Sequence, residues 1–128
     1  MQQGNWNTYQ KQWDFLPPDR MSVEATIIGC GSVGSVAAVA LLKMGLQHIE
    51  VWDDDRIEQH NLPNQFLPER IGEYKVTGLD NLADIFGVDG QVTTTAKKWQ
   101  GESLYAEIVI SAVDDMIARR SLLSLIHI

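Results

Sequence analysis

The sequence predicts an α/β fold, Rossmann-like, in which a mostly parallel sheet carries helices on both faces. Three observations indicate it. The glycine-rich turn Gly29–Gly34 follows an apolar run and opens a helix-like stretch. A second apolar run leads into Asp53, and a third, Ile108–Val113, runs straight into Asp114. Strands buried on both faces read as such apolar runs, and their carboxyl ends meet at one edge of the sheet, where ligands bind.

The elements follow from this pattern in chain order. We expect an N-terminal arm at 1–22, strand 23–28, helix 32–44, strand 48–53, a loop, helix 75–86, strands 91–96 and 108–113, and a closing helix. The first helix is rich in Ala, Val and Leu and ends at Gly45. The loop at 56–74 is polar, contains two prolines and lacks a sustained helical period, so it is predicted to face a ligand. Helix 75–86 places one apolar face toward the core: Val76, Leu79, Leu82, Ala83 and Phe86.

The glycine loop predicts a phosphate-binding turn. Gly29 permits the turn, Gly31 lets a phosphate approach the backbone, and Gly34 lets helix and strand pack closely. Free N–H groups at the helix start, around Ser32 and Val33, favour negative oxygens. Asp53 is placed to accept hydrogen bonds from ribose hydroxyls. The structural alternative is a small-residue turn selected for packing.

Polar residues in and after the loop extend the predicted nucleotide site. Asn61, Gln65 and Arg70 are placed to reach phosphates. Lys75 stands at a helix start, where the macrodipole disfavours a cation unless an anion is near, and a bound phosphate would be that anion. The alternative is an ordinary exposed lysine.

Asp114 is expected at the same edge of the sheet as the glycine loop. A carboxylate beside a triphosphate typically binds Mg²⁺, together with phosphate oxygens and water. The structural alternative makes Asp114 or Asp115 the N-cap of the closing helix, and we expect one to cap and the other to bind metal.

In their order along the chain, these motifs resemble those of the ThiF/MoeB/HesA superfamily of ubiquitin-activating-type adenylyltransferases. The matching residues are Gly29, Gly31, Gly34, Asp53, Asn61, Leu62, Gln65, Gly72, Lys75, Asp114, Asp115 and Arg119. The resemblance implies ATP and Mg²⁺ as cofactors, with Lys75 and Asp114 catalytic and Asp114 holding the metal. It further implies adenylation of the C-terminal carboxylate of a ubiquitin-like or sulfur-carrier protein, and a homodimer when full length.

The chain departs from the family pattern in several places. Asn64 stands where the family has an arginine, and Arg70 is a candidate replacement. Paired C-x-x-C zinc motifs are absent from the sequence, and the one cysteine, Cys30, lies inside the glycine loop, where a small buried side chain is needed rather than a nucleophile.

Two other classes of function stay open. An NAD(P)-binding Rossmann oxidoreductase would use the glycine loop and Asp53 but gives no role to Lys75 or Asp114. A non-catalytic nucleotide-binding or dimerisation module is compatible with the missing arginine at position 64.

Composition and the chain ends set the remaining expectations. A net charge of −7 disfavours nucleic-acid and anionic-membrane partners, and the absence of a signal-peptide pattern favours the cytoplasm. The segment 123–128 resembles the translated end of a sequencing adapter. We therefore expect an incomplete ATP-binding adenylation domain at 23–122, truncated at its C-terminus, with about four of the roughly six strands of a doubly wound domain.

Overall fold

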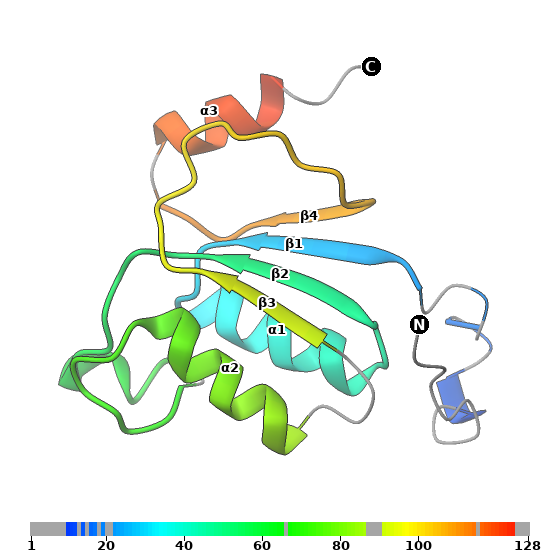
Figure 1. The fold of residues 1–128 in the computed structure, drawn as a ribbon, viewed down its shortest axis with the longest axis horizontal. Coiled ribbons are helices and arrows are strands. Elements are labelled where there is room, and N and C mark those ends of the chain that lie inside the picture. Colours follow the sequence, from blue (N-terminus) through cyan, green and yellow to red (C-terminus); the bar gives the residue numbers. More distant parts are fainter. Residues whose placement is uncertain are drawn as a thin grey trace.

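The computed structural model confirms the predicted α/β fold (Figure 1). It describes residues 10–12, 14, 16, 17, 19, 22–65, 67–86, 91–114 and 116–124. The elements are β1 (Glu24–Ile28), α1 (Ser32–Lys43), β2 (His48–Trp52), the 3-10 turn η3 (Gln59–Asn61), α2 (Lys75–Phe86), β3 (Gln91–Thr95), β4 (Ile108–Ser111) and α3 (Met116–Ser124). Among these residues, no helix combines the length and the hydropathy needed to cross a membrane.

All four strands are parallel, in the order β3-β2-β1-β4. The register pairs Ile28 of β1 with Trp52 of β2 and with Ser111 of β4, and it pairs Trp52 with Thr95 of β3. The carboxyl ends of all four strands therefore lie side by side. The loops that follow the four strands therefore all begin at the same edge of the sheet.

The sheet buries apolar side chains on both faces, because successive residues of a strand point to opposite sides. On one face, Ala25 and Ile27 of β1 pack with α1 and α2 through Leu42 and Leu79. On the other face, Ile28 packs with Trp99 of the β3–β4 loop and with Leu122 of α3. Figure 1 shows α1 and α2 on one side of the sheet, with α3 and the long β3–β4 loop on the other.

The two ends of the loop between β2 and α2 pair with each other. Ile57 is buried, and it forms two backbone hydrogen bonds, its N–H donating to Glu73 and its carbonyl accepting from Gly72. The Arg56 guanidinium stacks on the Tyr74 ring at 4.0 Å from its centroid. The loop is therefore closed at its base, beside the start of α2, where the Lys75 N–H donates to the Asp55 carbonyl.

Several predicted boundaries differ by one or two residues. Strands β2 and β4 end at Trp52 and Ser111, before the predicted ends at 53 and 113. Residue 53 leaves the ladder because its carboxylate turns toward the glycine loop, although its N–H still donates to Thr95. In the predicted N-terminal arm, the Gln12 amide donates to the Met44 carbonyl and Leu16 packs against the core. Residues 1–9 and 125–128 and Asp115 lie outside the described residues.

Strand β4 pairs with β1 on one side only and presents exposed apolar side chains. Ile108 is 39% and Val109 is 41% exposed. An unpaired strand with apolar side chains is a template for association with another chain. The free edge of β4 is therefore a candidate site of self-association.

Val109→Lys is expected to reduce concentration-dependent self-association of the chain, because a charged side chain on an edge strand opposes pairing with a second edge. Sedimentation velocity over a concentration series measures the effect. Ile85→Lys is the control, since Ile85 is an exposed apolar residue on α2. A parent chain that stays monomeric throughout, or an equal effect of both variants, contradicts the expectation.

Candidate functional site

A cavity of about 620 Å³ lies at the carboxyl ends of the strands. Eight of the predicted site residues line it: Gly29, Gly31, Ser32, Val33, Asp53, Gln65, Lys75 and Asp114. They come from the β1–α1 turn, the end of β2, the following loop, the start of α2 and the end of β4. The parallel register thus brings together residues that are distant in the sequence.

The three glycines of the turn meet different surroundings. Gly29 has a φ of 104°, and a Cβ there would lie 2.6 Å from the Ala112 carbonyl oxygen. A Cβ at Gly34 would lie 1.8 Å from the carbonyl oxygen of Gly29, so helix and turn touch at that point. A Cβ at Gly31 would meet nothing closer than Gln65 Nε2 at 3.7 Å. Gly29 and Gly34 are thus required by packing, whereas Gly31 borders open space in the cavity.

Asp53 fastens the glycine turn to the end of β2. One carboxylate oxygen accepts a hydrogen bond from the Cys30 N–H at 2.6 Å, and the other accepts from the Asp55 N–H at 2.7 Å. A carboxylate has lone pairs left after two such bonds, so the contact with ribose predicted for Asp53 stays compatible with this geometry. The observed bonds also give Asp53 a structural role.

Lys75 is buried, which excludes the alternative interpretation that it is an ordinary exposed lysine. Its side chain is 8% exposed, and its ammonium lies 3.8 Å from a carboxylate oxygen of Asp55. Burial, with the nearby Asp53 carboxylate, raises the pKa of Asp55, while Lys75 lowers it. A buried cation facing a cavity is an uncommon arrangement and favours an anionic ligand.

The surroundings of Cys30 disfavour a role as nucleophile. It is fully buried, and its thiol donates to the Lys75 carbonyl at 3.8 Å. Burial, followed by the Asp53 carboxylate, raises the pKa of the thiol to about 12. The thiolate is therefore scarce at neutral pH, in agreement with the packing role predicted for this side chain.

The Asp114 side chain is fully exposed at the mouth of the cavity. One of its oxygens lies 3.9 Å from the Arg119 guanidinium, which also donates to the Val113 carbonyl at 2.7 Å. Exposed carboxylate oxygens are the ligands that Mg²⁺ takes beside phosphates, so the donor chemistry here fits the predicted ion.

Two predicted residues are not part of the cavity lining. Gly34 is buried in the helix–turn contact. Asn61 is buried in η3, where its side-chain oxygen accepts from the Glu58 N–H at 2.9 Å. The candidate replacement arginine, Arg70, instead pairs with Glu73 at 3.7 Å and does not line the cavity.

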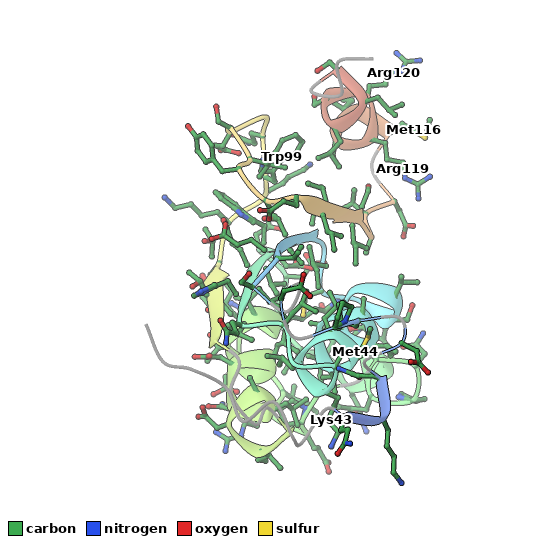
Figure 2. All side chains as sticks on the ribbon, turned by 90° about the vertical axis from the view of Figure 1, so that its right-hand side faces the viewer. Lys43, Met44, Trp99, Met116, Arg119 and Arg120 are labelled. Atoms are coloured by element: carbon green, nitrogen blue, oxygen red, sulfur yellow. The ribbon has the colours of Figure 1, made fainter. Side chains whose placement is uncertain are left out.

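Several residues that line the cavity were not predicted as ligand contacts. Trp52, Asn64, Lys98 and Trp99 all border the cavity. Trp99 sits on the β3–β4 loop, on the side of the sheet that carries α3 (Figure 2). The available signal was position, since Trp52 precedes Asp53 and the pair at 98–99 follows the carboxyl end of β3.

The cavity combines a cation, backbone donors and exposed carboxylates. Gln65 Oε1 is buried there and accepts no hydrogen bond from the described residues. A donor on a bound ligand would remove the free-energy cost of this unpaired acceptor. Lys75 and the N-terminus of α1 suit phosphate oxygens, and the two tryptophans provide flat apolar surface. Chemically, the arrangement suits a nucleotide polyphosphate with a divalent cation.

Comparison with known proteins agrees with this geometry. The family model described as ThiF family matches residues 20–127. The Escherichia coli tRNA N6-threonylcarbamoyladenosine dehydratase TcdA, solved in complex with ATP, aligns with a TM-score of 0.85 at 19% identity. E. coli MccB, solved with AMPCPP and MccA, aligns with a TM-score of 0.78 at 21% identity. At these identities the two structures establish a shared fold.

The chain spans only part of these proteins. The alignments cover 98% of this chain and 57% of TcdA, and 92% of this chain and 41% of MccB. Uncharacterized protein MJ0693 of Methanocaldococcus jannaschii is 38% identical over 56 residues, which are 41% of this chain and 23% of that protein.

The glycine geometry predicts opposite outcomes for two similar substitutions. Gly34→Ala should destabilise the fold by about 3 kcal/mol, because its Cβ overlaps a backbone oxygen. Gly31→Ala should leave stability within about 1 kcal/mol, because its Cβ meets only ordinary contacts, yet weaken ATP binding by narrowing the approach to the turn. Urea unfolding and calorimetric titration with ATP measure the two effects. Equal destabilisation by both variants would refute the distinction.

Proposed function

The chain belongs to the ThiF family and has an adenylyltransferase-type nucleotide-binding fold, and from that premise we propose that the protein uses ATP to adenylate a carboxylate. The proposed acceptor is the C-terminal carboxylate of a ubiquitin-like or sulfur-carrier protein. The reaction releases pyrophosphate and leaves an acyl-adenylate.

One observation carries the proposal: a buried lysine and an exposed carboxylate line the same cavity as the glycine turn. Lys75 and Asp114 come from different elements, and both border the cavity that Gly31 opens onto. An oxidoreductase that transfers hydride needs neither a buried ammonium nor an exposed carboxylate beside its phosphates. A module that only binds nucleotide could use the same pair, so pyrophosphate exchange is the measurement that separates it from an adenylating enzyme.

In the proposed step, an acceptor carboxylate oxygen attacks the α-phosphorus, the bond from that phosphorus to the bridging oxygen of the β-phosphate breaks, and pyrophosphate leaves. The chain supplies position and charge rather than a covalent group. Backbone N–H groups at Ser32 and Val33 hold phosphate oxygens, and the Lys75 ammonium stabilises the negative charge that develops there. Asp53 orients the ribose while it holds the turn. The buried Oε1 of Gln65 is placed to accept a hydrogen bond from a donor group of the bound ligand.

The residue proposed to hold Mg²⁺ is Asp114. When bound, Mg²⁺ would neutralise part of the charge of the triphosphate and of the departing pyrophosphate. The ion pair with Arg119 is exposed, so its loss costs the fold little.

The acceptor, the assembly and the compartment remain part of the proposal. A net charge of −7 favours a protein tail over nucleic acid as the acceptor, although TcdA is named for a tRNA substrate. A homodimer and a cytoplasmic location complete the proposed function, and no membrane partner is invoked.

We expect the protein to bind ATP with magnesium more tightly than NAD, because Lys75 and Asp114 complement a triphosphate rather than a nicotinamide. Calorimetric titration with both nucleotides measures this preference. ATP–pyrophosphate exchange with candidate carrier proteins, and in parallel with tRNA, then identifies the acceptor. Binding of NAD without ATP would reverse the assignment to an oxidoreductase, and exchange that depends on tRNA would reassign the acceptor.

Asp114→Ala is expected to lower pyrophosphate exchange on the order of 100-fold, because it removes the proposed metal ligand. Stability should change by less than about 1 kcal/mol, since the side chain is exposed. Asp84→Ala, an exposed acidic residue on α2, is the control and should retain exchange. Full exchange by Asp114→Ala together with lost stability would favour the capping role.

A further inference from the structure

The ion pair between Lys75 and Asp55 joins a buried group to an exposed one at the edge of the cavity. The two side chains are 8% and 68% exposed. We propose that Asp55 is a place-holding counter-ion, which pairs with Lys75 before nucleotide binds and releases it to the phosphates of ATP. The inference rests on the proposed function, because it takes the triphosphate as the competing anion.

The asymmetric burial makes such an exchange possible. The Lys75 side chain is largely buried, so its ammonium needs a nearby negative charge, whereas the exposed Asp55 carboxylate can turn into water. Among the described residues, Asp55 is the one carboxylate within 4.0 Å of that ammonium. Their separation of 3.8 Å exceeds the 2.7–2.9 Å or so of a charge-assisted hydrogen bond, so the contact is loose.

The backbone of Asp55 is held independently of its side chain. The Asp55 carbonyl accepts from the Lys75 N–H at 2.9 Å, and the Asp55 N–H donates to Asp53 at 2.7 Å. The carboxylate can therefore leave the ammonium while the start of α2 stays in place. Lys75 would then face the phosphates without movement of the helix.

Neighbouring charge favours departure of Asp55 once phosphates arrive. Carboxylate oxygens of Asp53, Asp54 and Asp55 lie within 4.8 Å of one another. Both oxygens of Asp53 accept from backbone N–H groups, and Asp55 is the member observed to pair with Lys75. A triphosphate adds negative charge to this cluster and competes directly for the same ammonium.

Calorimetric titration of the 128-residue chain with ATP and with adenosine tests the exchange. Asp55→Asn removes the competing charge and keeps the size of the side chain, so it should tighten ATP binding about two- to fivefold. Adenosine, which lacks phosphates, should bind as in the parent. Asp54→Asn carries the same charge change in the same cluster without the Lys75 contact, so its ATP affinity should stay within about twofold of the parent.

The conservative variant and the thermal stability separate exchange from a structural role. Asp55→Glu keeps the charge and should restore parental ATP affinity. Asp55→Asn should lower the melting temperature of the nucleotide-free chain and give a larger increase on ATP addition. Unchanged or weaker ATP binding by Asp55→Asn, or an equal loss for ATP and adenosine, would overturn the proposal. If Asp55→Asn binds ATP more tightly but the parent shows no pyrophosphate exchange, the counter-ion role is supported and the proposed adenylation is rejected.

Discussion

The carboxylate of Asp53 is the interaction on which the arrangement of the site depends. Its two oxygens hold the backbone N–H of Cys30, in the glycine turn, and that of Asp55, in the loop after β2. Hydrogen bonds to a charged group contribute about 1.5–3 kcal/mol each, enough to fix two segments that no strand pairing holds. The Asp55 carbonyl then receives the Lys75 N–H, so one acidic side chain sets the positions of the turn, the loop and the start of α2.

The fold tolerates a buried cation in a site that also needs to stay open. Removing an ammonium from water is costly unless a negative group compensates. Here the compensating carboxylate lies at the rim, where water already solvates part of it. The Asp55 carboxylate thus offsets the free-energy cost of burying Lys75. The cavity beside this pair stays wide enough for a larger anion. Stability without ligand and affinity for a ligand thus rely on the same ammonium.

Much of the fold followed from the sequence because its signals are local. Apolar runs and the glycine turn predicted the succession of strands and helices along the chain, and the bounds of α2 were predicted to the residue. The sequence did not predict which side chains a residue would contact where those contacts come from distant parts of the chain. Asn61 is predicted to bind phosphate, and the structure adds a local role, because its side-chain oxygen accepts a hydrogen bond from the Glu58 N–H in η3. Trp99 follows β3 in an irregular loop. Its position after the strand end was a hint, but its packing against Ile28 and Leu122 is a tertiary contact that no local pattern predicts.

The burial of Cys30 ties the redox behaviour of the chain to the integrity of its glycine turn. The single thiol of the sequence is buried in that turn, next to the Lys75 carbonyl, and its raised pKa keeps it protonated at neutral pH. Oxidants and alkylating reagents can reach it only when the turn opens locally. A ligand that holds the turn closed therefore protects the thiol. The rate at which Cys30 is oxidised or alkylated would then report how often the turn opens.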